Sequence, residues 1–471
     1  MLILAIDQGT HSTRAIIFDA RGRVVSIARQ PVALVRKSRR EIEQSPDEIR
    51  LSMQTVVDDV LNDPAVDREQ VAVAGMATQR SSVLAWDRIT GMPLSPVLSW
   101  QDTRVADTLQ MMMDHDQHIR ELTGLHLSPH YGAGKLQWLL EQVPAIREAL
   151  DTGTLVMGPL AGFLLHHLTD TRDEVVDAAN ASRTLLWNLH HRNWDDALLE
   201  LFRIPRQVLP TCVPICTDFG LTRLGNIPVK AVNGDQTAAL YAHGEPSGNT
   251  IMVNIGTGAF VLLPVDNPEA RPAGLLAGVS QSDRDTASYY IEGTVNGAAA
   301  ALEWAARKYN VSDPEARLPD WLDEIHNPTL FMNTIGGLGA PWWRAGPEAH
   351  FLDADVMAAE AMVAVIESIL FLVQANIEQI CTLNPTVGKI RISGGLSRLD
   401  GLCQRLANLS GLVVKRPAQV EATARGIAWQ AAGCPDDWSA TGNSKQFTPK
   451  QDSPLAGRYA QFIEKLQQLI T

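Results

Sequence analysis

The stretch "LILAIDQGTHSTRAIIFDARGRVV", residues 2–25, holds two apolar runs that predict neighbouring strands joined by a polar turn. Asp7 closes the first run, Gly9 and Thr10 follow it, and Ser12 lies just beyond. A buried carboxylate is costly unless it is paired or bound to a metal. Glycine lets backbone N–H groups approach an anion closely, and hydroxyl groups add donors. Two interpretations stay open here: a β-hairpin with a merely polar turn, or a hairpin that cradles a phosphate beside an acid placed for a metal ion.

The composition limits the classes of protein to which the chain can belong. With 471 residues, 45% of them hydrophobic, the chain predicts two large domains. A net charge of -13 argues against nucleic acid and anionic membrane surfaces as partners, because both reward basic patches. The five cysteines are too few and scattered for a disulfide framework, the N-terminus has no basic signal region, and no apolar stretch approaches the roughly 18 residues of a membrane span. These features predict a soluble, cytoplasmic protein.

Two further segments repeat the design of the opening. Residues 250–265, "TIMVNIGTGAFVLLPV", again give a strand, a turn with glycine and threonine, and a second strand. This repetition suggests duplicated domains whose hairpins hold a nucleotide from both sides of a cleft. Residues 389–414, "KIRISGGLSRLDGLCQRLANLSGLVV", predict a strand, a Gly-Gly turn and a helix, where a planar ring or phosphate can approach the backbone. An ordinary strand-to-helix turn explains that last segment equally well.

The segment "VKAVNGDQTAALYAHG", residues 229–244, places an acid at a strand-to-helix junction. Asp235 follows the bend at Gly234, beside the positive end of the helix dipole. A carboxylate there stays ionised and can accept a proton from a hydroxyl, or it can simply cap the helix. The motif by itself does not separate catalysis from capping.

Taken together, these segments resemble the FGGY carbohydrate kinases, and within that family the glycerol kinase branch. The resemblance runs through "DQGTHSTRAIIFD", "GMATQRSSVLAWDRITGMPLSPVLSWQDTR" (75–104), "GAGKLQWLL" (132–140), "NGDQTAALYA", "NIGTGAF", "GLGAPWW" (337–343), "VIESILFLVQANIEQI" and "ISGGL", and so covers nearly the whole chain. It implies an α/β fold of two ribonuclease-H-like (actin-like ATPase) domains with a cleft between them, residues 1–244 and 245–471. It also implies ATP and Mg²⁺ as cofactors.

Carried over position by position, the resemblance implies specific roles. Asp7 would hold Mg²⁺ through water, and Asp235 would be the catalytic base. The residues contacting ATP would be Thr10, Ser12, Arg14, Thr257, Gly258 and Gly395. The residues contacting the substrate would be Arg80, Ser81, Trp100, His130, Tyr131, Asp235 and Gln236. Phosphoryl transfer needs positioned phosphates, a metal and a base, and this set supplies them.

The chain departs from the family pattern mainly around the substrate. Ser81 stands where the glycerol kinase branch has a glutamate, and its tyrosine aligns with His130, although Tyr131 is adjacent. On the nucleotide side, the departures are His11, Ala299, Glu303 and Leu399. Loss of the glutamate removes a charge-assisted acceptor for substrate hydroxyls.

Two classes of function follow. The favoured one is an ATP-dependent kinase of a small polyol or sugar, acting on glycerol or on a four- or five-carbon polyol or ketose such as erythritol or xylulose. The rival is a non-catalytic actin-like nucleotide-binding protein. The resemblance allows a homodimer without fixing the oligomeric state.

Overall fold

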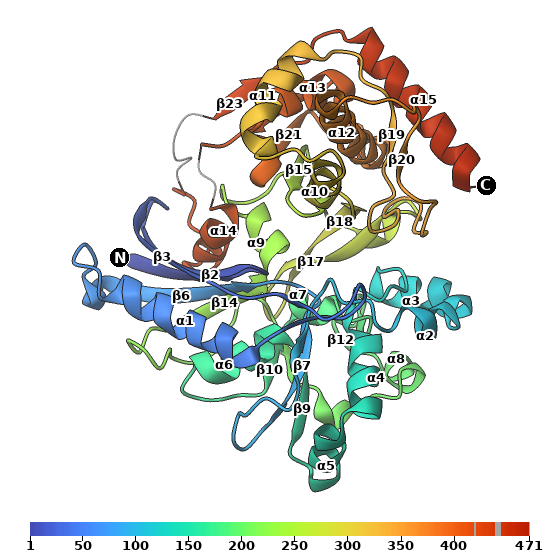
Figure 1. The fold of residues 1–471 in the computed structure, drawn as a ribbon. Coiled ribbons are helices and arrows are strands. Elements are labelled where there is room, and N and C mark those ends of the chain that lie inside the picture. The colour runs from blue at the N-terminus through green and yellow to red at the C-terminus, as the bar shows by residue number, and fades with distance from the viewer. Residues whose placement is uncertain (419–420, 439–443, 471) are drawn as a thin grey trace. The chain divides into compact units, whose positions relative to one another are not determined.

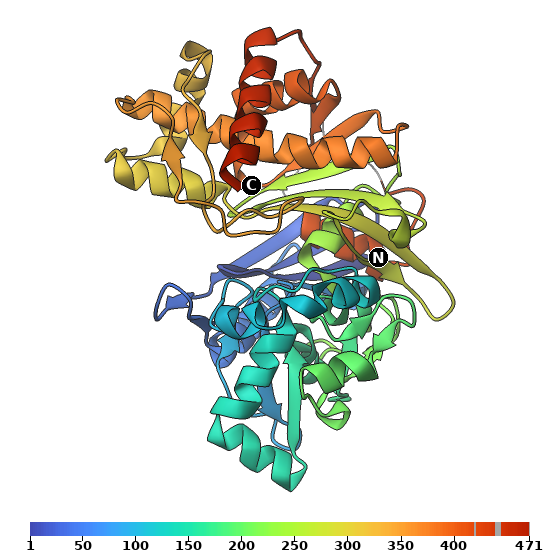
Figure 2. The same ribbon diagram turned by 90° about the vertical axis from the view of Figure 1, so that its right-hand side faces the viewer.

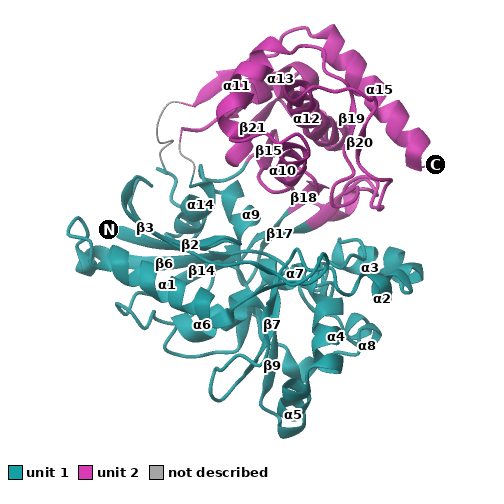
Figure 3. Ribbon diagram, viewed as in Figure 1, with its two compact units in different colours: residues 1–246, 278–289, 421–441 teal, residues 247–277, 290–420, 442–471 magenta. Residues whose placement is uncertain are grey.

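The computed structural model describes residues 1–418, 421–438 and 444–470 (Figure 1). The chain forms two compact α/β units (Figure 3). Unit 1 contains residues 1–246, 278–289 and 421–441, and unit 2 contains residues 247–277, 290–420 and 442–471. Each unit therefore includes segments that are far apart in the sequence.

The main sheet of unit 1 has five strands in the order β14-β6-β1-β2-β3. These strands are β1 (Leu2–Gln8), β2 (Ser12–Asp19), β3 (Val24–Pro31), β6 (Val71–Thr78) and β14 (Val229–Gly234). β1 runs antiparallel to β2 and parallel to β6, and β14 runs parallel to β6. The carboxyl ends of β1, β6 and β14 therefore meet at one edge of the sheet, where ligands bind in open α/β sheets.

Helices cover both faces of this sheet, with α1 (Pro46–Leu61) on one face and α14 (Ala422–Ala431) on the other (Figure 1). α1 begins where the Ser45 side chain accepts a hydrogen bond from the backbone N–H of Glu48, and Pro46 occupies the first turn. α14 contacts β1, β6 and β14 and crosses α9 (Asp235–Leu240) closely. At that crossing, a Cβ on Gly426 would lie 1.7 Å from the carbonyl oxygen of Ala238, so only glycine fits.

The remainder of unit 1 carries a second five-stranded sheet, in the order β4-β5-β8-β7-β9. Its strands are β4 (Val35–Arg36), β5 (Ile42–Gln44), β7 (Val83–Asp87), β8 (Val97–Leu98) and β9 (Leu155–Pro159). Short pairs join β10 (Val175–Asp177) to β13 (Thr211–Val213) and β11 (Trp187–Asn188) to β12 (Asn193–Trp194). The helices of this part are α2 (Ala106–Gln110), α3 (Asp116–Thr123), α4 (Gly132–Gln142), α5 (Pro144–Thr152), α6 (Leu160–Leu168), α7 (Ala178–Ser182) and α8 (Asp196–Leu201).

Unit 2 repeats the strand pattern of unit 1 in a seven-stranded sheet, in the order β17-β18-β16-β15-β21-β22-β23. The strands of this sheet are β15 (Thr250–Ile255), β16 (Ala259–Val265), β17 (Leu276–Ser282), β18 (Ala287–Val295), β21 (Lys389–Ser393), β22 (Val413–Arg416) and β23 (Lys445–Phe447). Most of β17 and the start of β18 fall within residues 278–289, which belong to unit 1. A short pair joins β19 (Phe331–Met332) to β20 (His350–Phe351). β15 runs antiparallel to β16 and parallel to β21, as β1 does to β2 and β6. The duplication predicted from the two hairpins is confirmed.

The helices of unit 2 pack around the long helix α12 (Figure 2). They are α10 (Ala299–Lys308), α11 (Pro314–Glu324), α12 (Ala358–Leu383), α13 (Asp400–Ser410) and α15 (Ser453–Ile470). The expectation that no apolar stretch approaches the length of a membrane span is wrong: by length and composition alone α12 could cross a membrane, since an 18-residue window has a mean hydropathy of 1.8. However, 83% of that window is buried inside the structure, and the core helix of a soluble protein passes the same test.

Candidate active site

The carboxyl edge of the main sheet of unit 1 collects the acidic and basic residues that the sequence singled out. β1 leads into the turn that begins at Gly9, β6 leads to Arg80, and β14 leads to Asp235. In the register of the β1–β2 hairpin, Asp7 lies directly opposite Arg14. Cross-strand partners have neighbouring side chains on one face. The strand order therefore brings the predicted phosphate and metal residues of unit 1 and its predicted catalytic base to one edge of the sheet.

Arg14 holds two carboxylates at this edge. Its Nη1 lies 2.8 Å from Glu421 Oε2 and 3.5 Å from Asp7 Oδ2. Glu421 is the residue directly before α14 and lies 407 positions from Arg14 along the chain. Glu421 could not be predicted from the sequence, because neither its spacing nor a local motif connects it to the hairpin.

Asp7 lies in an environment that opposes its negative charge. The pKa of the Asp7 carboxyl is raised to about 7: burial is the main cause, Arg14 opposes the rise, and the charges of Asp235 and Glu421 add to it. Two guanidinium groups, those of Arg14 and Arg80, thus face three carboxylates. Such an excess of oxygen ligands fits a hard divalent cation such as Mg²⁺, which prefers oxygen ligands and keeps several of its waters. Within the described residues no group of three His, Cys, Asp or Glu forms a ready metal cage, so a cation here would rely on water and phosphate oxygens.

Asp235 stands at a strand-to-helix junction, as predicted. β14 ends at Gly234, and α9 begins at Asp235. The capping position is occupied by Gly234 without a side-chain bond, so Asp235 is not the N-cap. Its Oδ1 accepts a hydrogen bond from the backbone N–H of Gln236 at 2.7 Å and lies 3.6 Å from Arg80 Nε. The Asp235 side chain keeps 24% of its surface exposed and remains accessible to a ligand.

Arg80 is buried against the backbone of the neighbouring strand end. A Cβ on Gly234 would approach Arg80 Cδ to 2.6 Å, so the glycine makes room for the arginine. Ser81, the next residue, is buried and has a φ of 66°, a left-handed conformation uncommon outside glycine. The guanidinium of Arg80 is thereby held next to Asp235 by local backbone geometry.

Trp100 connects the predicted substrate residues to the predicted phosphate turn. Its indole Nε1 donates a hydrogen bond to Thr10 Oγ1 at 2.9 Å. Gln44 Nε2 donates to the Thr10 carbonyl at 2.8 Å, which fixes the turn from a second side. Because the Thr10 hydroxyl accepts from Trp100, its own proton remains available to another acceptor, such as a phosphate oxygen.

His130 and Tyr131 differ in burial and in hydrogen bonding. Tyr131 is 7% exposed, whereas His130 is only partly buried, and His130 Nδ1 lies 3.0 Å from the carbonyl oxygen of Trp100. A carbonyl only accepts, so Nδ1 carries the proton and Nε2 is an acceptor in the neutral ring. Burial lowers the pKa of His130, which favours this neutral form.

Comparison with known proteins establishes the family. A model of the N-terminal domain of the FGGY family of carbohydrate kinases matches residues 2–242, and a model of the C-terminal domain of the same family matches residues 251–433. The chain belongs to the FGGY family of carbohydrate kinases. It is accordingly an ATP-dependent phosphotransferase with an alcohol group as acceptor.

Individual relatives agree with this assignment. Glycerol kinase from Alcanivorax borkumensis is 33% identical over 446 residues, which cover 91% of this chain and 88% of that protein. Glycerol kinase 1 from Pseudomonas aeruginosa is 33% identical over 442 residues, 91% of this chain and 89% of that protein. Plasmodium falciparum glycerol kinase with ADP matches the structure with a TM-score of 0.86 at 24% identity, covering 100% of this chain and 98% of that one. Xylulose kinase from Lactobacillus acidophilus gives 0.84 at 19% identity, covering 99% and 97%. The predicted two-domain actin-like ATPase fold is confirmed.

In unit 2 of this FGGY kinase, the predicted nucleotide residues lie on two adjacent parallel strands. The β15–β16 turn carries Thr257, which is exposed, and Gly258, which is buried. Gly395 is exposed just after β21, and a Cβ there would meet no atom within 4 Å. Gly394 passes so close to β15 that a Cβ on it would lie 2.5 Å from the carbonyl oxygen of Ile255. Thr257 and Gly395 therefore project from the same edge of the unit 2 sheet.

Proposed function

We propose that this FGGY kinase phosphorylates a hydroxyl of a small polyol or sugar, with Asp235 as the general base. The proposal rests on the accessibility and the position of the Asp235 carboxylate. This carboxylate is accessible, does not serve as a helix cap and lies 3.6 Å from Arg80, on the sheet edge that also bears Asp7 and Arg14. A non-catalytic actin-like nucleotide-binding protein has no use for such a base.

We assign the substrate hydroxyls to donors and acceptors around Asp235. The Arg80 guanidinium offers a rigid fork of donors that suits two adjacent hydroxyl oxygens. Gln236 adds an amide, and Trp100 supplies an apolar ring whose N–H is already used by Thr10. Nε2 of neutral His130 is a hydrogen-bond acceptor, and it replaces in part the carboxylate acceptor that is missing at Ser81. Tyr131 is the more deeply buried neighbour and takes a supporting role.

The phosphates of ATP are assigned to the two hairpin turns. In unit 1 the ligands are Thr10, Ser12 and Arg14, and in unit 2 they are Thr257 and Gly258, with Gly395 beside the adenine or ribose. Arg14 must exchange its contact with Glu421 for a phosphate oxygen, and the 2.8 Å pair keeps the guanidinium oriented until then. Asp7 would hold Mg²⁺ through water, and the bound cation would offset the charge developing on the phosphoryl oxygens.

The acceptor is the part of the proposal with two candidates. The glycerol kinases from Alcanivorax borkumensis and Pseudomonas aeruginosa are each 33% identical to this chain, which favours glycerol. Ser81 favours a larger acceptor, because a short neutral side chain supplies no carboxylate and leaves more space than the glutamate of the glycerol kinase branch. Erythritol and xylulose represent the four- and five-carbon alternatives.

The experiment is an ADP-release screen with ATP, Mg²⁺ and three- to five-carbon polyols and ketoses. We expect one acceptor to dominate kcat/KM, and Asp235→Asn to lower its turnover by about 10²-fold or more, the usual contribution of a general base. ATP binding by that variant should stay within two-fold of the parent. Unchanged turnover in Asp235→Asn would remove this residue from the mechanism, and no turnover with any acceptor would refute the substrate class.

The remaining parts of the proposal concern organisation and location. The assignment of residues 1–244 and 245–471 to the N- and C-terminal FGGY domains is supported by the ranges of the two family models. A cytoplasmic location is supported by the five cysteines, all of which are free thiols, as expected in a reducing compartment. The net charge of -13 supports a small-molecule partner over nucleic acid or an anionic membrane.

A further inference from the structure

The motif "GAGKLQWLL" contains a charged residue that the proposed reaction does not use. Lys135, on α4, is 0% exposed. Its Nζ donates three hydrogen bonds, to the backbone carbonyls of Ser99 (2.8 Å), His130 (2.9 Å) and Ser81 (3.2 Å). An ammonium group has three N–H donors and no acceptor, so this set uses all of them.

The three carbonyls belong to three segments that carry proposed substrate residues other than Asp235 and Gln236. Ser81 follows Arg80, Ser99 precedes Trp100, and His130 is itself one of the set. These carbonyls lie 54, 36 and 5 positions from Lys135 along the chain. One buried ammonium thus joins three segments, two of which are also linked by the pairing of Val83 in β7 with Leu98 in β8 and by the bond from the Trp100 N–H to Ser82 Oγ.

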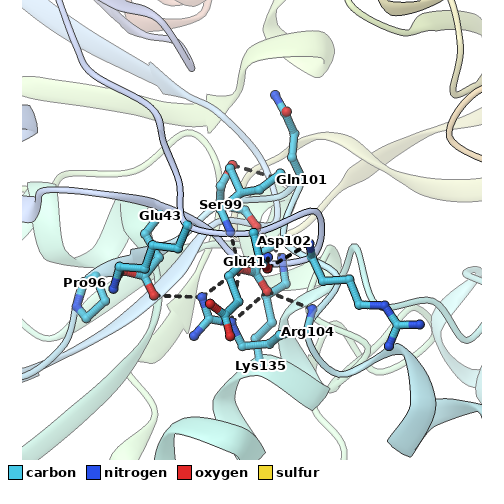
Figure 4. Close-up of polar contacts among 12 residues, drawn as sticks. Glu41, Glu43, Pro96, Ser99, Gln101, Asp102, Arg104 and Lys135 are labelled. Atoms are coloured by element: carbon cyan, nitrogen blue, oxygen red, sulfur yellow. Dashed lines mark hydrogen bonds and ion pairs between the residues drawn. The ribbon is translucent and has the colours of Figure 1, made fainter.

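The charge of Lys135 is met by these carbonyls and not by an acid. Within the described parts of the chain, no carboxylate lies at ion-pair distance from its Nζ. The nearby carboxylate, Asp102, is engaged by Arg104 through bonds of 2.8 and 2.9 Å and by the backbone N–H of Ile42 at 2.7 Å (Figure 4). Arg104 also reaches Glu43 at 2.8 Å, so the acids of this network are already satisfied.

Burying an ammonium is unfavourable, and an apolar side chain of similar length would fill the same volume without that penalty. Accordingly, burial lowers the pKa of Lys135 to about 7, although the charge of Asp102 acts in the opposite direction. A lysine offers three directed donors that a methionine lacks. One of them holds the carbonyl of Ser81, whose positive φ needs support from its surroundings.

We propose that Lys135 is a positioning residue: its ammonium fixes the backbone of three segments so that Arg80, Trp100 and His130 present one arrangement to the acceptor substrate. The effect on the acceptor substrate rests on the proposed function, whereas the joining of the three segments does not. The experiment therefore has one arm that needs no activity and one that does.

The first arm compares Lys135→Met with Ile146→Ala by hydrogen exchange of the ligand-free protein. Ile146 is 0% exposed on α5 and has an apolar side chain, so this control weakens the same unit without touching the three carbonyls. We expect amides in segments 79–83, 98–102 and 128–132 to exchange at least ten-fold faster in Lys135→Met only. Should Lys135→Met not fold, Lys135→Gln, which keeps two N–H donors, carries the same test. Unchanged exchange in all three segments, or equal acceleration by Ile146→Ala, would overturn the proposal.

The second arm measures kinetics with the acceptor that the screen identifies. Lys135→Met should raise KM for the acceptor about ten-fold or more, equivalent to about 1.4 kcal/mol. It should leave KM for ATP within about three-fold, while Ile146→Ala should leave both values near those of the parent. A purely structural role predicts equal losses for both substrates, and that result would refute positioning. If the parent phosphorylates no acceptor, the proposed function fails while the exchange arm still decides the role of Lys135.

Discussion

Replacing Asp7 by asparagine should stabilise unit 1, and the gain should grow with pH. Burial raises the pKa of Asp7 from 3.8 to about 7, a difference of about 3 units. At about 1.36 kcal/mol per unit, the folded protein therefore carries a penalty of about 4 kcal/mol when this carboxylate is fully ionised. Asparagine has a similar shape and no charge, and Arg14 keeps its 2.8 Å contact with Glu421.

The pH dependence follows from proton binding in the two states. Below pH 3.8 the carboxyl is protonated in both states, so Asp7 imposes no penalty. Between pH 3.8 and 7 the unfolded chain releases the proton and the folded protein keeps it, so the stability of the parent falls as the pH rises. Above pH 7 the penalty is complete. The advantage of Asp7→Asn should thus increase by about 3 kcal/mol between pH 5 and pH 8, two of the pKa units falling within that window.

The assay must report on unit 1 alone, because a chain of two units need not unfold in one step. Urea titrations with EDTA and no nucleotide, read by pulsed hydrogen exchange of the β1 peptide, meet that need. The control is Asp58→Asn, at an exposed position on α1. If the stability gain of Asp7→Asn does not change from pH 5 to pH 8, or if the variant is less stable than the parent at pH 8, the conclusion that burial destabilises the ionised Asp7 carboxylate is refuted.

Three more experiments, with four substitutions, test other contacts of the site. In a double-mutant cycle, Trp100→Phe and Thr10→Val should show a coupling of about 0.5–1.5 kcal/mol in kcat/KM, the range of one neutral hydrogen bond; strictly additive effects would contradict the 2.9 Å contact. Ser81→Glu should shift relative kcat/KM toward glycerol and away from larger acceptors, and a parent that already prefers glycerol over all of them would contradict the role given to Ser81. Glu421→Gln should lower KM for ATP about two- to five-fold, because a partly exposed ion pair that competes with phosphate is worth about 0.2–1 kcal/mol; a higher KM would show that Glu421 assists nucleotide binding.

Much of the fold was predictable because the decisive signals are local. The Asp7 hairpin, its repeat at residues 250–265 and the Asp235 junction are each contained within 25 residues, and the structure has all three. Pairing β1 with β6, and β6 with β14, then follows from the parallel order that such units adopt. The positions of Asp7, Arg80 and Asp235 at one edge are a consequence of that order.

The residues that sequence analysis missed act through contacts between distant segments. Glu421 approaches Arg14 across 407 positions, and no spacing rule covers such a separation. Lys135 occurs in a quoted motif, but lysine is almost never fully buried, so an amphipathic pattern places it at the surface. The burial of Glu367 in α12 was equally hard to predict. This glutamate interrupts an apolar run, yet it is buried because Arg405 and Arg458 neutralise its charge.

The late position of α14 in the chain affects how the protein is made. The strands and helices within residues 1–246 leave the ribosome first, yet one face of their sheet is covered by residues 422–431. At about 5–20 residues per second, roughly 10–40 s separate the synthesis of residue 246 from that of residue 431. During that interval Gly75, against which Ile427 and Ala431 finally pack, lies on an uncovered apolar strand face. Nascent chains halted between these points should therefore bind chaperones that recognise exposed apolar strands, and release from them should coincide with the appearance of α14.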